Sequence, residues 1–421
     1  MPTTTKKYNS LRKAIGPGFL LAGAAIGVSH LVQATRAGAD YGLILIGCLI
    51  IACISKYPFL EFGPRYFSAT GNNLISGYKQ LGKFPYYTYL TITFGTMFII
   101  QASVTIVTAG LAEHLFQLGF SPFVWSFIIL SACILLLLIG KYKGLDISMK
   151  VIITLLALAT LFAVVMASQS ETATLALQKP STPFWNVTGL AFIIAFMGWM
   201  PIPIDASIWH SIWSKAKFKE TKVMPQQKDC FTDFNIGYLS AGFIGVLFFL
   251  LGFFVMFGND MEFSSNSVEF SGQLIDLYGA SLGEWSKPII AVAAFITMLS
   301  TTLAVTDAYP RVIAELLYSE ESGEEIDKKK WKSYKVTVFI VPILSLLILY
   351  FMSGAFTTLV DFAAGLSFLS APFLGWFNYR LVTKHIAKSY RPKISYRFFS
   401  LVCLALLIAF NLLYLYWVIF V

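Results

Sequence analysis

The chain has 421 residues, of which 57% are hydrophobic and 13% are charged, and its formal net charge is +9. A soluble globular domain carries roughly 25% charged residues, so this composition excludes an ordinary soluble fold. The basic excess does not indicate nucleic-acid binding, because it is spread over alternate loops between apolar segments rather than gathered in one patch.

Apolar segments of about 18 residues or more recur along the whole chain, which is the pattern of membrane-spanning helices. We predict an all-α membrane protein in which residues 1–421 form a single transmembrane domain, with a cytoplasmic tail at 1–13. The predicted spans, eleven in number, cover residues 14–36, 42–63, 86–116, 122–140, 147–168, 186–212, 234–258, 287–313, 336–353, 358–380 and 396–420.

Basic residues lie in alternate loops of this arrangement. All but three of the 31 Lys and Arg residues fall in the tail or in loops on the same side, and this count places Lys56 in such a loop. The three exceptions are Arg36, Lys179 and Lys287. Because Lys and Arg are enriched on the cytoplasmic side, we predict a multi-pass plasma-membrane protein with its N-terminus in the cytoplasm and its C-terminus outside.

The loop at 259–286 fits that orientation. It lies on the predicted outer side, contains acidic residues but no Lys or Arg, and is long enough for a short surface helix. The acidic composition of this loop therefore supports the same topology.

The first and sixth predicted spans contain helix-breaking residues. Glycine occurs at positions 16, 18, 23 and 27 of the first, and the sixth contains Pro201 and Pro203 in the middle of an apolar run. Proline removes a helical hydrogen bond, and unpaired backbone in a membrane is tolerated only where it lines a protein-enclosed cavity. The two spans are an odd number of crossings apart, so they run in opposite directions. Broken helices at matching places in inverted halves indicate the binding site of a secondary transporter, although two ordinary kinked helices remain an alternative.

Short motifs in these two spans resemble a known family. The first span contains Gly16-Pro-Gly-Phe19 and continues to Ala37-Gly-Ala-Asp-Tyr-Gly42, and the sixth ends in Ile208-Trp-His-Ser211. These stretches are similar to spans 1 and 6 of the Nramp divalent-metal transporters. The resemblance implies a LeuT-like fold, with spans 1–5 and 6–10 as inverted repeats, helices 1 and 6 broken and an eleventh helix at the periphery. It also implies proton-linked transport.

The metal-binding motifs of that family are missing. Where the family has Asp-Pro-Gly-Asn, this chain has Gly27-Val-Ser-His30, and Pro203-Ile-Asp205 replaces Met-Pro-His. Mg²⁺ prefers several oxygen ligands, and transition metals prefer sulfur and imidazole. A site left with Asp205 and His30 suits neither class of metal ion well.

We therefore predict a different substrate at the two breaks. Half-helix N-termini carry free N–H donors and a partial positive charge, which favours a small oxyanion. Bicarbonate fits especially, because its hydroxyl would donate to Asp205 while its oxygens accept from Ser29 and His30. Nramp relatives without the metal ligands also look like bicarbonate carriers. The predicted substrate-binding residues are Gly27, Ser29, His30, Pro203, Asp205 and Ser207.

The alternatives concern Asp205 and the class of protein. Asp205 is also suited to cap a helix or to ligate a cation in a proton-coupled Mg²⁺ or Mn²⁺ transporter. A non-transporting membrane receptor of the same fold is the alternative from another class. An enzyme is not expected, since the HExxH motif of membrane metalloproteases does not occur. We expect no cofactor, a small-ion substrate, the lipid bilayer but no nucleic acid as partner, and a monomer.

Ionisable residues inside the predicted spans are candidates for a coupling path for protons or another cation. His210, Asp307 and Arg311 form the predicted path. The alternatives are a packing role for His210 and a structural ion pair for Asp307 and Arg311, which are four residues apart. His30 fits either a proton-binding or a neutral hydrogen-bonding role, and Asp361 is expected to cap the start of the tenth span.

Overall fold

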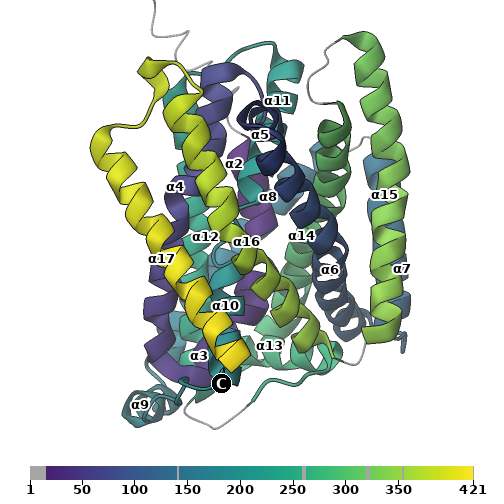
Figure 1. The fold of residues 1–421 in the computed structure, drawn as a ribbon. Helices are drawn as coiled ribbons and strands as arrows, with labels where there is room; N and C mark the ends of the chain where they lie inside the picture. Colours follow the sequence, from purple (N-terminus) through teal and green to yellow (C-terminus); the bar gives the residue numbers. More distant parts are fainter. Residues whose placement is uncertain (1–15, 140–141, 258–261, 319–322, 353–354, 421) are drawn as a thin grey trace, which may run out of the picture.

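The structure is a computed structural model, which describes residues 16–139, 142–257, 262–318, 323–352 and 355–420. The predicted cytoplasmic tail at 1–13 lies outside the described residues. Long helices run along one axis of the molecule, and the described residues contain no β strand (Figure 1). We call the end that carries α5 (Leu74–Leu81) the α5 end, and the opposite end, which carries α13 (Ser267–Leu282), the α13 end (Figure 1).

In the described part of the chain, nine long helices run between the two ends. They are α4 (Ile46–Thr70), α6 (Lys83–Phe116), α7 (Pro122–Ile139), α8 (Tyr142–Ala167), α12 (Gln227–Val255), α14 (Ser286–Tyr318), α15 (Glu324–Met352), α16 (Phe356–Lys384) and α17 (Ile394–Phe420). Two further crossings are split into short helices. The first consists of α2 (Pro17–Ala25), the π-helix η1 (Ser29–Ala34) and α3 (Thr35–Tyr41), and the sixth of α10 (Val187–Trp199) and α11 (Ala206–Thr221). The remaining short elements are η2 (Gly42–Leu45), α9 (Glu171–Gln178) and η4 (Lys388–Tyr390).

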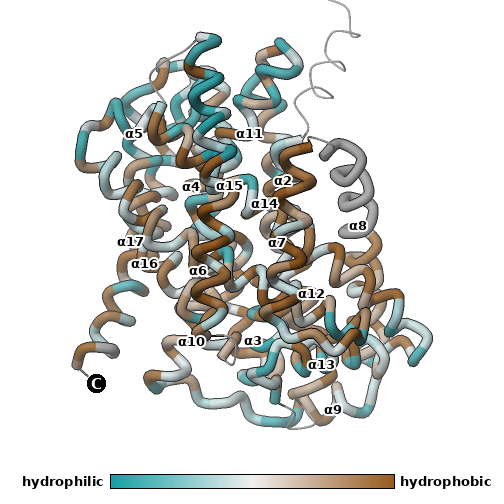
Figure 2. The backbone as a smooth tube through the Cα atoms, turned by 90° about the vertical axis from the view of Figure 1, so that its right-hand side faces the viewer, coloured by the Kyte–Doolittle hydropathy of each residue, from teal (hydrophilic) through white to brown (hydrophobic). Residues whose placement is uncertain are grey.

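The helices have the composition of membrane spans. Among the described residues, 8 helices are long and apolar enough to cross a membrane, or up to 9 if α8 and α9 count as one bent span. In this count η1, α3 and α4 form one continuous segment. The helices α2, α10 and α11 are not counted, because they have only 9, 13 and 16 residues. Hydrophobic residues fill the middle of the bundle and hydrophilic residues gather toward its two ends (Figure 2). The chain is therefore a multi-pass membrane protein.

Both predicted helix breaks are present. In the first span, α2 ends at Ala25, and the chain resumes as a π-helix at Ser29, a form that often marks functional sites. In the sixth span, α10 ends at Trp199 and α11 starts at Ala206, with Pro201 and Pro203 between them. The breaks confirm the prediction and exclude two merely kinked helices.

The broken spans are enclosed by the others. The first packs on α12 and α14, and α10 packs on α16. Gly198 permits the α10–α16 contact, because a Cβ there would collide with the carbonyl oxygen of Ala364. In contrast, α7, α15 and α17 expose large apolar side chains on the outside of the bundle, as lipid-facing helices do.

Two expectations were wrong. Lys56 does not lie in a loop, because α4 continues to Thr70 and holds its side chain fully buried at 0% exposure. Asp361 does not cap a helix, because α16 begins at Phe356, so Asp361 lies within its second turn.

Candidate substrate site at the two broken helices

A cavity of about 40 Å³ lies between the two breaks. A buried water needs roughly 10–15 Å³ of such volume, so the cavity has room for about three water-sized groups. Its wall includes Ser29 from the first span and Pro203 from the sixth, both predicted as substrate-binding residues. The other lining residues are Ala24, Ala25, Val28, Ile100, Val104, Trp199, Ile202, Trp209, Thr301 and Val305.

Besides Nε2 of His210, two buried polar atoms at the N-cap or within α11 have no hydrogen-bond partner in the described structure. One is Oδ1 of Asp205, which holds the N-cap position of α11 without making a side-chain capping bond. The other is Nε1 of Trp209, whose side chain lines the cavity. The two residues are one helical turn apart and therefore lie on the same face of α11. This face offers an unused acceptor and an unused donor. Trp209 lines the cavity, and Asp205 does not.

His30 is fully buried and bonded at both ring nitrogens. Its Nε2 lies 2.8 Å from the carbonyl oxygen of Ala241 in α12, and its Nδ1 lies 2.8 Å from Oγ of Ser29. Oγ of Ser29 also lies 2.7 Å from the carbonyl oxygen of Ala25, and its single hydrogen bonds either that oxygen or Nδ1 of His30. His30 thus positions Ser29 at the cavity, and neither of its ring nitrogens is left without a protein partner.

Gly27 leaves no space for a side chain. A Cβ at this position would lie 2.6 Å from Oγ1 of Thr301 in α14. That hydroxyl donates to the carbonyl oxygens of Gly23 at 2.9 Å and Ile26 at 3.2 Å, which satisfies the otherwise free C-terminal end of α2. The place of the family's aspartate is therefore filled by Thr301.

Comparisons with known proteins establish the family. The family model described as "Natural resistance-associated macrophage protein-like" (Nramp) matches residues 18–417. The chain belongs to the Nramp family. It is 32% identical over 410 residues to an uncharacterized protein of Pasteurella multocida (strain Pm70), which covers 97% of this chain and 93% of that protein.

More distant Nramp proteins are also similar. A protein of Staphylococcus saprophyticus named "Divalent metal cation transporter MntH" is 23% identical over 321 residues, covering 73% of this chain and 70% of its own length. The Eremococcus coleocola manganese transporter has a similar solved structure, with a TM-score of 0.69, 16% identity, and coverage of 98% of this chain and 88% of that one. This structural likeness confirms the LeuT-like fold with α17 as the eleventh helix.

The chain is thus an Nramp-family transporter with a changed set of side chains at its breaks. Within the described ranges, no group of three or more His, Cys, Asp or Glu side chains is arranged to hold a metal ion. Asp205 contributes the carboxylate at the break of the sixth span.

Lys56 is a site residue that the sequence analysis missed. Its Nζ lies 2.7 Å from the carbonyl oxygen of Gly198, 3.0 Å from that of Met200 and 3.2 Å from that of Ile202. Its charge also interacts with that of Asp205. An ionisable residue inside an apolar segment is the signal that could have identified it, had it not been counted among the loop residues.

Ser207 is drawn into helix packing. Its Oγ accepts a hydrogen bond of 2.9 Å from Nδ2 of Asn378 in α16, and Oδ1 of Asn378 accepts one of 2.6 Å from the hydroxyl of Tyr78 in α5. Ser207 is not among the residues that line the cavity. Its predicted contact with substrate stays a prediction.

His210 lies next to a carboxylate that sequence reasoning also missed. Nε2 of His210 is 3.7 Å from Oδ2 of Asp233 in α12. Asp233 in turn accepts from the N–H of Gly16 at 2.9 Å and from that of Gly18 at 2.6 Å. It therefore ties the start of α2 to α12. Its position just before a predicted span made it look like a loop residue.

Asp307 and Arg311 form the ion pair given as the alternative to a coupling role. Nε of Arg311 donates to Oδ2 of Asp307 at 2.6 Å, and the hydroxyl of Tyr334 donates to Oδ1 at 2.8 Å. Both residues line a cavity of about 380 Å³ at the α5 end, among α2, α11, α14 and α15. Their predicted part in coupling stays a prediction.

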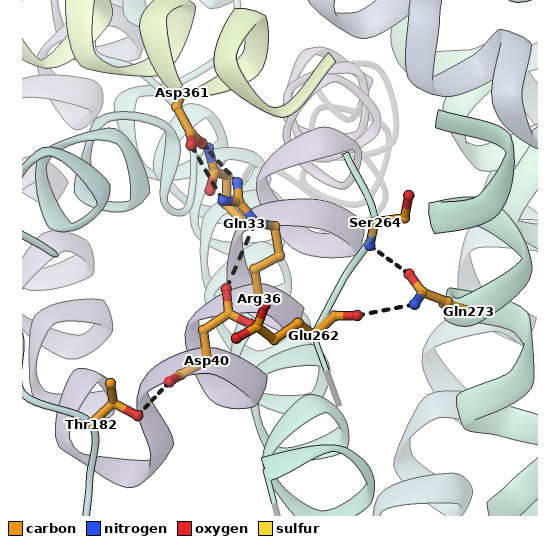
Figure 3. A network of polar contacts seen from close by, with 8 residues as sticks. All are labelled: Gln33, Arg36, Asp40, Thr182, Glu262, Ser264, Gln273 and Asp361. Atoms are coloured by element: carbon orange, nitrogen blue, oxygen red, sulfur yellow. Dashed lines mark hydrogen bonds and ion pairs between the residues drawn. The ribbon is translucent and has the colours of Figure 1, made fainter. Parts of the chain in front are cut away.

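At the α13 end, a polar network joins the first span to the tenth (Figure 3). Arg36 donates to Asp361 through Nη1 at 2.8 Å and Nη2 at 3.3 Å, and Nε2 of Gln33 donates to Asp361 at 2.8 Å. The Arg36 guanidinium also lies 4.9 Å from the centre of the Phe192 ring in α10. These contacts hold α3, α10 and α16 together on that side of the cavity.

Proposed function

We propose that this Nramp-family transporter carries a small inorganic oxyanion, with bicarbonate as the favoured substrate. The supporting observation is the unpaired acceptor and donor on one face of α11, Oδ1 of Asp205 and Nε1 of Trp209. Buried polar atoms without partners are costly, so a substrate that pairs with both is favoured. Bicarbonate brings a hydroxyl for the carboxylate and oxygens for the indole N–H.

The charges around the site are compatible with an anion. The repulsion expected between a monovalent anion and Asp205 is offset by Lys56, whose ammonium interacts with that carboxylate. The cavity volume of about 40 Å³ suits an ion of a few heavy atoms. A metal cation would pair with Asp205 directly but offers the Trp209 N–H no acceptor of its own.

Transport by alternating access follows from the two broken helices. We assign the α5 end to the cytoplasm by the positive-inside rule, which places the 380 Å³ cavity inside and the Arg36–Asp361 pair outside the cell. Protons are the proposed coupling ion, and His210, Asp307 and Arg311 are the proposed residues of their path. The proposed unit is a monomer in the plasma membrane.

A divalent cation remains the second candidate. The S. saprophyticus relative is named as a divalent metal cation transporter, and the E. coleocola structure is that of a manganese transporter. In that case Asp205 would be the carboxylate ligand. A non-transporting receptor would bind the substrate at the same place without moving it.

The deciding experiment uses purified protein in liposomes that contain a pH-sensitive dye. Entry of bicarbonate alone raises internal pH, whereas entry together with one proton delivers carbonic acid and does not, so uptake of labelled bicarbonate is recorded beside the dye signal. Protein-free liposomes under the same CO₂ measure passive CO₂ diffusion. We expect saturable uptake of labelled bicarbonate above the protein-free level and no uptake of Mn²⁺ or Mg²⁺. Saturable Mn²⁺ uptake that Asp205→Ala abolishes would contradict the anion proposal, and substrate binding without flux would identify a receptor.

Trp209→Phe tests the donor with a matched control. It removes the unpaired N–H and keeps the ring, so we expect the KM for bicarbonate to rise about tenfold, as for loss of one hydrogen bond to a charged group. Trp199 also lines the cavity, but its Nε1 already donates to Oγ of Ser367 at 3.0 Å. Trp199→Phe should therefore leave KM nearly unchanged. Equal effects of both variants would contradict the assigned role of Trp209.

A further inference from the structure

The ammonium of Lys56 has three carbonyl acceptors at the break of the sixth span. Gly198 belongs to the last turn of α10, and Met200 and Ile202 belong to the non-helical segment that follows it. A protonated amine has three N–H donors, and these carbonyl oxygens use all three. The side chain is fully buried, so this cluster is shielded from water.

These carbonyls form the kind of site that binds a cation. The C-terminal end of a helix carries a partial negative charge, and its last carbonyls lack helical partners. Unwound backbone carbonyls at such ends coordinate coupling cations in transporters with broken helices. In this chain the position is taken by a side chain from α4. The matching carbonyl end of α2 is covered by the hydroxyl of Thr301.

We propose that Lys56 is a tethered cation that takes the place of a mobile coupling ion at the end of α10 and sets the selectivity of the site for anions. It fixes the carbonyl end of the break and repels metal cations that approach Asp205. Transport then needs no Na⁺ or K⁺. This role rests on the proposed anion transport. The first test, which measures thermal stability, does not require bicarbonate.

The test replaces Lys56 with Gln and, separately, with Met. Lys56→Gln removes the charge and leaves carbonyl and amide oxygens around an empty position, which a monovalent cation can occupy. We expect its thermal stability to rise saturably with NaCl or KCl relative to choline chloride at equal ionic strength. Lys56→Met fills the space with an apolar end, and we expect it to show no such dependence. The wild-type protein and Lys332→Gln, a variant at an exposed lysine of α15, should be equally stable in all three salts.

Uptake gives the second measurement. Wild-type bicarbonate uptake should proceed at the same rate in choline and sodium media, because the cation is built in. Lys56→Gln should lose at least about tenfold in choline, as for loss of a hydrogen bond from a charged group, and should regain part of this loss in sodium. Wild-type uptake that requires Na⁺ or K⁺ would overturn the proposal, as would full activity of Lys56→Gln in choline.

The outcomes separate the two proposals. If the wild type carries no bicarbonate but Lys56→Gln acquires saturable stabilisation by Na⁺, the substrate is wrong and the role of Lys56 stands. If both variants fail to fold, the wild type alone decides, because saturable Na⁺ or K⁺ binding to it would overturn the tethered cation and its absence would support it.

Discussion

Nη1 of Arg36 in α3 lies 2.8 Å from Oδ1 of Asp361 in α16, and this ion pair joins the first broken span to the tenth at the α13 end (Figure 3). At the α5 end, a cavity of about 380 Å³ lies among α2, α11, α14 and α15. The pair thus lies on the side of the substrate cavity where the helices are held together. We infer that opening toward the α13 end requires the separation of Arg36 from Asp361.

The first prediction concerns this pair. Arg36 and Asp361 are 14% and 30% exposed, so Arg36→Gln should cost the closed state about 1 kcal/mol and shift the balance toward the open state about fivefold. The measurement is modification of a cysteine placed at Val28, a cavity-lining position, by a membrane-impermeant thiol reagent added from the α13 side. This cysteine is introduced into a protein whose five native cysteines have been replaced. We expect faster modification and slower transport.

A charge exchange provides the control for that prediction. Arg36→Asp combined with Asp361→Arg should restore slow modification, because the attraction is re-formed. Lys219→Gln removes the pair with Asp327, whose side chains are 50% and 56% exposed, and should change neither rate. Faster modification in Lys219→Gln would mean that the effect is not specific to the α13 end.

The second prediction concerns the start of α2. Asp233 is buried and accepts from the N–H groups of Gly16 and Gly18, so Asp233→Asn weakens the tie between α2 and α12. Loss of a charged acceptor for a backbone donor costs about 1.5–3 kcal/mol. We expect faster hydrogen exchange in 17–25, with little change in α17. Asp327→Asn at the surface serves as the control, and unchanged exchange in Asp233→Asn would show that other contacts hold α2 in place.

The third prediction distinguishes packing from substrate binding at Ser207. Asn378 is fully buried, donates to Oγ of Ser207 and to the carbonyl oxygen of Phe59, and accepts from Tyr78. Asn378→Leu leaves these groups unpaired, at about 1–3 kcal/mol for each unsatisfied group, so we expect a large drop in thermal stability. Ser207→Ala should lower stability by about 1 kcal/mol and leave the KM for bicarbonate unchanged. A rise in KM without loss of stability would return Ser207 to the substrate site.

The positions of the helix breaks could be predicted from sequence because they depend on local chemistry. Pro201 and Pro203 cannot continue a helix, and the apolar residues around them place the break inside the membrane. The family resemblance then supplied the arrangement of the repeats. The likeness to the solved manganese transporter structure confirmed the LeuT-like fold.

The partners of the polar side chains could not be predicted in the same way, since they depend on packing between distant segments. Lys56 and the carbonyl oxygen of Gly198 are 142 residues apart, and Asp233 and Gly18 are 215 apart. Lys56 lies inside the predicted span 42–63, and it was taken for a loop residue only because it was counted with the basic residues that follow that span. His30 was predicted to bind substrate, but its bond to Ala241 in α12 was not visible from sequence.

The fourth prediction concerns Gly27, the position that an aspartate occupies in the Nramp metal motif. A Cβ there would lie 2.6 Å from Oγ1 and 2.7 Å from Cγ2 of Thr301, so Gly27→Ala should destabilise the protein by about 1–3 kcal/mol, as overpacking does, and should slow bicarbonate uptake. A methyl group at Gly95 in α6 would have no neighbouring atom within 4 Å, so Gly95→Ala should be neutral or stabilising by up to about 1 kcal/mol.

Thr301→Ala in the Gly27→Ala background should recover part of the stability, because it removes the colliding atoms. Recovery should be incomplete, since the carbonyl oxygens of Gly23 and Ile26 then lose their donor. Gly27→Asp should not produce Mn²⁺ uptake, because the added side chain would collide with Thr301 and Lys56 would still repel the metal. Mn²⁺ uptake by Gly27→Asp alone would show that the first break can still form a metal site, and would return the protein to the metal-transporting members of its family.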